Sequence, residues 1–184
     1  MRIIGGRLRG RKIMFPKKKD VRPTKDRIRE SVFNMIAERV PGAKVLDLFA
    51  GSGAYGLEAL SRGAATAVFV DNDPECLDVI EDNAQHLGIR EDMETVRGNI
   101  PECLEQLGNK NEKYDIVFAD PPFNRGLAKK TLQYIYQYDI LSRLGVLILE
   151  HAALESVRGA SVDVNIFKEK TYKDITITIL GDGR

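Results

Sequence analysis

Four consecutive residues, Asp120-Pro121-Pro122-Phe123, form the most specific chemical pattern in the chain. The two prolines fix φ and lack N–H donors, so the segment presents outward carbonyl groups. An amino group on an aromatic base is a poor nucleophile, because its lone pair is delocalised into the ring. The Asp120 carboxylate and the Pro121 carbonyl can hold its two hydrogens, and Phe123 can stack on an extruded base, which contributes about 1–3 kcal/mol. We therefore expect these four residues to be catalytic in methyl transfer to such an amino group.

A glycine-rich segment follows the first predicted strand of the sheet. Gly51, Gly53 and Gly56 match the G-x-G-x-x-G pattern, in which glycines allow a tight turn and close approach to a ligand. Asp71 follows twenty residues after Gly51, where it can bind a ribose diol. These features fit either a dinucleotide or S-adenosyl-L-methionine (AdoMet). Asp47, four residues before the first glycine, favours AdoMet, because it suits a cationic amino group and not a pyrophosphate.

Two further strand ends carry polar residues. Asn99 can accept a hydrogen bond from an adenine amino group, and Ile100 can pack on the adenine ring. An ordinary strand-to-helix turn is the alternative interpretation of this pair. Asp73 precedes Pro74 and is expected to cap the helix that begins there.

Alternating strands and helices are expected to position these residues. Buried strands are predicted at 45–49, 67–70, 93–96, 114–119 and 146–149, and helices at 55–62, 74–87, 101–107 and 128–138. The end of the chain differs, because 164–172 and 175–180 alternate as an antiparallel hairpin does. The pattern predicts an α/β, Rossmann-like fold with a mainly parallel, seven-stranded sheet. Ligands of such sheets bind at the carboxyl ends of the strands, near the topological switch point.

The positive charge of the chain is concentrated at its beginning. Residues 1–29 contain twelve Lys or Arg and two acids, whereas the whole chain has a net charge of +1. We expect a basic extension at 1–23, with short strands or a hairpin at 1–15, before a methyltransferase domain at 24–184. A helix starting at Pro23-Thr24 should bury Ile28, Val32, Phe33, Ile36 and Ala37 on one face. Such an arm suits a phosphate backbone, although a solubilising tail is the alternative.

The candidate RNA-binding residues are the basic side chains of this extension and of the first turns of the following helix. They are Arg2, Arg7, Arg9, Arg11, Lys12, Arg22, Lys25, Arg27 and Arg29.

Composition excludes several other classes of protein. The 184 residues suit one domain, and 43% hydrophobic with 30% charged residues suit a soluble one. No apolar run is long enough for a membrane span, and no signal-peptide core is present. Cys76 and Cys103 lack metal or redox spacing and are expected to be buried thiols in a reducing cytosol, which indicates a cytoplasmic protein. The proposed chemistry needs no metal, and nothing in the sequence demands more than a monomer.

Several segments resemble the bacterial small-subunit rRNA guanine-N2 methyltransferases, which are class I AdoMet enzymes. The resemblance lies in residues 47–53, 57–64 and 120–123, and in two N-terminal segments. These N-terminal segments, 1–12 and 22–30, resemble the extension of that family. The resemblance implies methylation of one guanine of 16S rRNA, with the small ribosomal subunit or its assembly intermediate as the partner.

The resemblance also implies residue roles. Asp47 and the loop Phe49-Ala50-Gly51-Ser52-Gly53 would hold the methionine part of AdoMet, Asp71-Asn72 the ribose, and Asn99-Ile100 the adenine. Asn99 departs from the Asp that is common in the family, and Asp71 stands where several members have Glu.

Two other functions remain open from the sequence. The same tetrad serves adenine-N6 and cytosine-N4 methylation of DNA, although the chain has little room for a target-recognition domain. The second alternative is an RNA-binding assembly factor without catalysis, against which the intact Asp120 and glycine loop argue.

Overall fold

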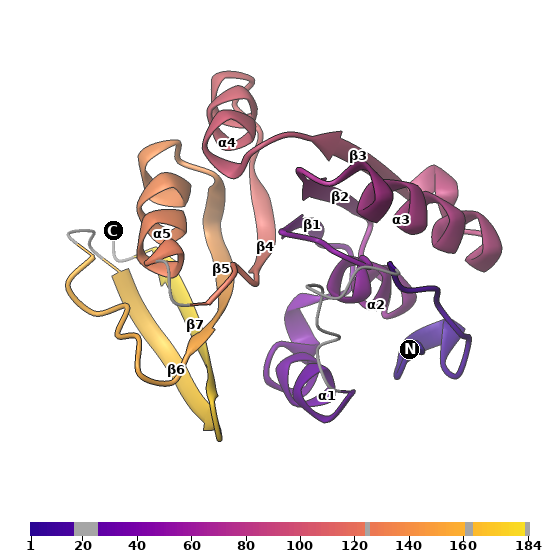
Figure 1. The fold of residues 1–184 in the computed structure, drawn as a ribbon, viewed down its shortest axis with the longest axis horizontal. Coiled ribbons are helices and arrows are strands. Elements are labelled where there is room, and N and C mark those ends of the chain that lie inside the picture. Colours follow the sequence, from indigo (N-terminus) through magenta and orange to yellow (C-terminus); the bar gives the residue numbers. More distant parts are fainter. Residues whose placement is uncertain (17–25, 124–125, 161–163, 183–184) are drawn as a thin grey trace.

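A single seven-stranded sheet forms the centre of the molecule (Figure 1). The computed structural model describes residues 1–16, 26–123, 126–160 and 164–182. The strand order is β3-β2-β1-β4-β5-β7-β6. The strands are β1 (Lys44–Leu48), β2 (Thr66–Asp71), β3 (Met93–Arg97), β4 (Tyr114–Ala119), β5 (Leu141–Ala152), β6 (Val164–Tyr172) and β7 (Ile175–Asp182). Pairing is parallel from β3 to β5 and antiparallel from β5 through β7 to β6. The predicted mainly parallel sheet with an antiparallel C-terminal hairpin is confirmed.

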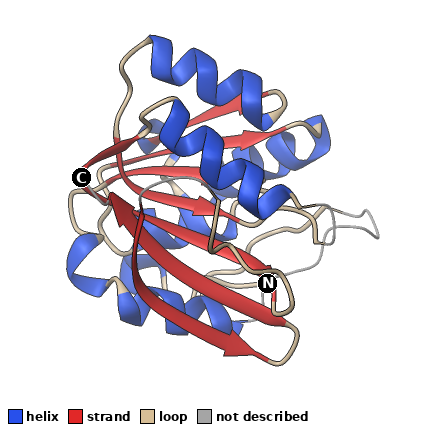
Figure 2. Ribbon diagram, turned by 90° about the vertical axis from the view of Figure 1, so that its left-hand side faces the viewer, coloured by secondary structure: helices blue, strands red, loops and turns tan. Residues whose placement is uncertain are grey.

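Helices cover both faces of this sheet (Figure 2). They are α1 (Asp26–Met35), α2 (Ala54–Ser61), α3 (Pro74–Leu87), α4 (Ile100–Asn109) and α5 (Leu127–Gln137). Side chains of a strand alternate between the two faces of the sheet, so each strand contributes to the hydrophobic core on either face. Phe118 of β4 packs with α1, α2 and α3, whereas its neighbour Val117 packs with α4 and α5.

Most predicted boundaries lie within two residues of the observed ones, but β5 and α1 differ. Strand β5 has twelve residues, whereas the sequence predicted only 146–149. The predicted strand stops at residue 149 because the polar residues Glu150 and His151 follow the apolar run. In the structure both residues pair with β7 and are buried. The predicted stripe of α1 extended to Ala37, but the α-helix ends at Met35 and a 3₁₀ turn covers Ala37–Arg39. The expected cap at Thr24 lies outside the described residues.

The predictions for Asp73 and for the two cysteines are confirmed. The Asp73 carboxylate accepts a hydrogen bond from the Glu75 backbone N–H at 3.0 Å and so caps α3. Cys76 and Cys103 are buried free thiols. Across the described residues, no helix has both the length and the apolar character that crossing a membrane requires.

The basic N-terminal segment is tied to the body of the protein by a buried carboxylate. Residues 1–16 form a short antiparallel hairpin with a bridge between Arg2 and Lys12 and a 3₁₀ turn at Gly6–Leu8. The Ile3 N–H donates to the Arg11 carbonyl at 2.9 Å and the Ile13 N–H to the Met1 carbonyl at 3.1 Å. Glu58 of α2 is fully buried and accepts hydrogen bonds from the backbone N–H groups of Ile4 at 2.8 Å and Gly5 at 2.6 Å. The segment is therefore held on α2 with its backbone donors satisfied.

Replacing Glu58 by alanine should destabilise the protein strongly. The change leaves the Ile4 and Gly5 backbone donors without their acceptor and removes the carboxylate that lies 3.8 Å from the buried Arg29 guanidinium. Removing one partner of a buried ion pair costs about 3–5 kcal/mol. Urea unfolding followed by circular dichroism measures the loss. The exposed Glu105→Ala on α4 is the matched control and should change the free energy of unfolding by less than about 0.5 kcal/mol. Equal stability of the two variants would contradict the anchoring role of Glu58.

Candidate active site

The glycine loop and the proline tetrad start from neighbouring strands. Strands β1 and β4 are parallel partners, with Leu48 aligned with Ala119. Phe49 and Asp120 therefore leave the sheet at adjacent points of its carboxyl edge. This is the point at which the strand order reverses, where open α/β sheets bind their ligands.

The tetrad presents its side chains at different depths. Asp120 and Phe123 are half-buried, Pro121 is buried and Pro122 is exposed. Asp120 and Phe123 thus stay accessible to an incoming group, whereas Pro121 packs inward. This arrangement is compatible with the predicted roles of the carboxylate and the ring.

The glycine loop has an unusual backbone. Phe49, Gly51 and Gly53 have φ values of 58°, 55° and 73°. At Gly53 a Cβ atom would lie 2.9 Å from the Ile80 side chain, so glycine is required there for space as well as for conformation. The left-handed conformation of Phe49 redirects its ring: strand alternation would place it on the face of Asp47, but it packs against the α4 and α5 face.

Asp71 closes this loop from the end of β2. One carboxylate oxygen accepts a hydrogen bond from the Gly51 N–H, and the other accepts one from the Asp73 N–H, both at 2.9 Å. Each carboxylate oxygen has a second lone pair. Asp71 can therefore hold the loop and still accept hydrogen bonds from a diol.

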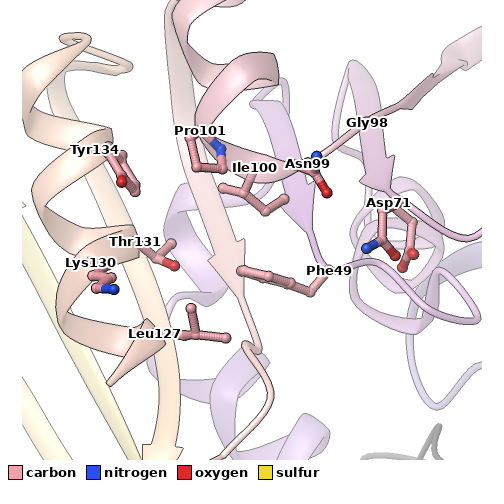
Figure 3. Close-up of a pocket in the computed structure, with 11 residues that line it drawn as sticks. Phe49, Asp71, Gly98, Asn99, Ile100, Pro101, Leu127, Lys130, Thr131 and Tyr134 are labelled. Carbon is pink, nitrogen blue, oxygen red and sulfur yellow. The ribbon is translucent and has the colours of Figure 1, made fainter. Parts of the chain in front are cut away.

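A pocket opens beside this loop, at the carboxyl ends of the strands. Its lining residues are Phe49, Asp71, Asn72, Gly98, Asn99, Ile100, Pro101, Leu127, Lys130, Thr131 and Tyr134. Figure 3 shows Phe49 between Asp71 on one side and the α5 residues on the other. Five of the predicted cofactor residues thus meet in one pocket, whereas Asp47, Ala50, Gly51 and Gly53 do not line it.

Sequence reasoning missed the α5 wall of the pocket. Leu127, Thr131 and Tyr134 are spaced four and three residues apart, which places them on one face of the helix, with Lys130 beside them. This spacing was available in the sequence. It could not be distinguished from ordinary core packing, however, because nothing in the sequence showed which face of α5 is turned toward the glycine loop.

Asp47 lies beneath the start of α2. Its side chain is 3% exposed and accepts a hydrogen bond from the Gly56 N–H at 2.9 Å. Burial raises the pKa of Asp47 to about 8; the Gly56 hydrogen bond opposes this rise and the nearby Asp71 charge adds to it. A cationic group near Asp47 would favour its ionised form.

The structure corrects the predicted RNA-binding set at one position. Arg29 is fully buried; it donates to the Asp26 carboxylate and the Arg2 carbonyl and lies 3.8 Å from Glu58. It is a structural cation of the N-terminal anchor and is not available to RNA. Six predicted residues are exposed: Arg2, Arg7, Arg9, Arg11, Lys12 and Arg27. Arg22 and Lys25 lie outside the described residues.

Two of the exposed arginines have carboxylate partners. Arg2 pairs with Asp26 at 3.3 Å and Arg7 with Asp92 at 3.4 Å. Exposed pairs of this kind contribute about 1 kcal/mol or less, so a phosphate can displace them.

Comparison with known proteins fixes the family. The model of the family described as conserved hypothetical protein 95 matches residues 1–181. Ribosomal RNA small subunit methyltransferase D of Escherichia coli K12 is 36% identical over 170 residues, which are 92% of this chain and 84% of the relative. This chain therefore belongs to the family described as conserved hypothetical protein 95.

Further relatives and solved structures agree. The Haemophilus influenzae protein of the same name is 34% identical, covering 82% of this chain and 78% of the relative. The solved structure of the Escherichia coli protein yhhF has a TM-score of 0.84 and 34% identity, over 98% of this chain and 96% of that one. A hypothetical protein of Thermus thermophilus has a TM-score of 0.84 and 27% identity, over 97% and 98% of the two chains. The expected fold and family are thus confirmed.

Substituting Asp47 by asparagine should change how stability depends on pH. The folded protein keeps the Asp47 proton up to about pH 8, whereas the unfolded chain releases it near the ordinary value of 3.8. The unfolded state therefore binds fewer protons between these values, so the wild-type free energy of unfolding falls as pH rises through this window. Asp47→Asn keeps an acceptor for Gly56 and removes this contribution. The variant should gain stability relative to wild type, on the order of a few kcal/mol by pH 8.

Thermal unfolding between pH 5 and pH 8 measures this difference. The exposed Asp78→Asn on α3 is the control and should follow the wild-type curve. Parallel curves for Asp47→Asn and wild type would show that Asp47 is ionised in the folded protein.

Proposed function

We propose that this protein transfers the methyl group of AdoMet to the exocyclic N2 amino group of one guanine in 16S rRNA. The observation that carries the proposal is the adjacency of the glycine-loop pocket and the Asp120 tetrad at the β1–β4 switch point. The family supports it, since curated relatives are named small-subunit rRNA methyltransferases.

The residues of the pocket suit AdoMet. Asp71 offers paired carboxylate oxygens for the ribose, while Phe49 and Ile100 offer apolar contacts for the adenine, with Asn99 beside them. Asp47, under the same loop, suits the amino group of the methionine part. AdoMet supplies a methyl group on a positively charged sulfur, which makes the transfer an in-line displacement.

The tetrad prepares the acceptor. The Asp120 carboxylate and the Pro121 carbonyl would each accept a hydrogen bond from the guanine amino group, which localises the nitrogen lone pair. As the C–N bond forms, the methyl–sulfur bond breaks to leave a neutral thioether, and one amino hydrogen leaves as a proton. Phe123 stacks on the extruded base and fixes its plane. Holding the base in this orientation beside the pocket supplies much of the rate, because positioning alone can account for several kcal/mol of a barrier.

The exposed cations of the N-terminal segment provide the RNA-binding surface. They stand on a segment fixed to α2, so their charges keep a constant position relative to the catalytic edge. We expect the partner to be the small ribosomal subunit or its assembly intermediate, in the cytoplasm, with the protein acting as a monomer.

Replacing Asp120 by alanine should abolish methyl transfer and leave AdoMet binding within about twofold of wild type, because Asp120 does not line the described pocket. Small subunits lacking the modification and, in parallel, DNA are incubated with tritiated AdoMet, and labelled nucleosides are separated. Calorimetry measures AdoMet binding by the same protein samples. Label in guanine-N2 with wild type, and none with Asp120→Ala, is the expected result.

Other outcomes of this experiment decide between functions. Wild-type label in adenine or cytosine of DNA would identify a DNA methyltransferase. Heat of AdoMet binding without label in any nucleic acid would contradict the proposed reaction. Wild-type turnover by Asp120→Ala would remove Asp120 from the mechanism.

Substituting Arg7, Arg9 and Arg11 together by alanine should weaken RNA binding and flatten its salt dependence. Each lost phosphate contact lowers the slope of log affinity against log salt by about 0.7–0.9. Filter binding to small subunits at several KCl concentrations measures the slope. The control triple Arg39→Ala, Lys110→Ala and Arg143→Ala removes the same charge from exposed positions outside the N-terminal segment. An equal slope for both triples would show that the arm does not contact phosphate.

A further inference from the structure

A buried tyrosine stands between the two loops of the site. Tyr55 is the second residue of α2, is 6% exposed and donates a hydrogen bond to the Glu150 carboxylate at 3.3 Å. Its ring stacks on Phe118 with the ring centroids 4.8 Å apart. Phe118 lies two residues before Asp120 on β4. Tyr55 therefore connects α2, the helix that follows the glycine loop, with β4, the strand that precedes the tetrad.

Glu150 approaches the same place from β5. Leu149 is aligned with Ala119, so Glu150 and Asp120 are the next residues along two paired strands. Glu150 is 4% exposed, and burial raises its pKa, while the hydrogen bond from Tyr55 lowers it. Neither Tyr55 nor Glu150 lines the described pocket, so the expected cofactor contacts do not account for this pair.

The charges around the Tyr55 hydroxyl fix its role as a donor. Burial raises its pKa, and the nearby carboxylates of Glu150, Asp120 and Asp47 raise it further. These carboxylates come from the carboxyl ends of three neighbouring strands, β5, β4 and β1. The phenol thus keeps its hydrogen and remains a donor at the centre of an acidic group of side chains.

We propose that Tyr55 and Glu150 are positioning residues that set the Asp120 carboxylate relative to the glycine loop. This inference rests on the proposed function, because it gives the pair a role in aligning the amino nitrogen with the methyl donor. The hydrogen bond joins the start of α2 to β5, and the stacked rings join it to β4. Losing either contact shifts one loop against the other while each loop keeps its own ligand contacts. The turnover number should therefore fall without a matching loss of substrate affinity.

Steady-state kinetics on small subunits test the pair. Tyr55→Phe retains the stacked ring and removes the donor, and Glu150→Ala removes the acceptor. Both should lower kcat by about 10- to 100-fold, since a displacement near 1 Å can have such an effect, with KM for AdoMet and for subunits within about twofold. Glu150→Gln keeps an acceptor oxygen and should stay within about threefold of the wild-type kcat. A loss of kcat in Tyr55→Phe, which keeps the stacked ring, distinguishes positioning from simple packing, and rescue by Glu150→Gln shows that an acceptor oxygen and not a charge is needed.

Tyr114→Phe is the matched control. Tyr114 is a buried tyrosine at the other end of β4, so the same change there should leave kcat unaltered. Wild-type kcat in Tyr55→Phe and Glu150→Ala, or an equal loss in Glu150→Gln and Glu150→Ala, would overturn the positioning role. A rise in KM for AdoMet that accounts for the whole loss would also overturn it. An inactive wild-type protein would contradict the proposed function itself. If the wild type is active, the kinetic outcomes just described would contradict only the positioning role of Tyr55 and Glu150.

Discussion

Parallel pairing between β1 and β4 is the constraint on which the site depends. The two strands are far apart in the sequence, yet their alignment places the glycine loop and the proline tetrad side by side. Because the strand order reverses there, helices leave the two strands toward opposite faces: α2 packs on one face of the sheet and α5 on the other. The space between the diverging segments holds the pocket. A different strand order would keep every motif intact and separate the methyl donor from its acceptor.

A second constraint is the buried acid and base that hold the N-terminal segment. Burying charges is unfavourable unless they are paired and hydrogen-bonded. Glu58 meets this condition through the backbone of Ile4 and Gly5 and through Arg62. Arg29 donates to the Arg2 carbonyl and to Asp26, while its Nε lies 3.8 Å from Glu58 without a hydrogen bond. The N-terminal segment is therefore a partner of the buried charges and not a separate attachment. This explains why Ile3 and Ile13 belong to the same core cluster as α1, α2 and α3.

Much of the fold and part of the site could be predicted from the sequence. Local signals sufficed for strands β1 to β4, for the Asp73 cap and for the pocket residues at three strand ends. Features that depend on tertiary contacts could not be predicted. Arg29 resembles its exposed basic neighbours, and only the fold reveals its buried carboxylate. Glu150 looked like the end of β5 because a buried polar residue breaks an apolar run. Phe49 changes face because of its left-handed backbone, which no property of phenylalanine indicates.

Helix α2 links these features within eight residues. It follows the left-handed N-cap residue Gly53, donates a hydrogen bond from the Gly56 N–H to Asp47, and carries Tyr55 and Glu58. Each added residue would rotate the rest of a helix by about 100°. An insertion or deletion here would therefore turn the Glu58 anchor away from the N-terminal segment while leaving the glycine loop unchanged. Insertions and deletions among relatives of this chain should accordingly be absent from α2 and tolerated in the loops at the amino ends of the strands. The helix thus sets a fixed distance between the glycine loop and the N-terminal segment.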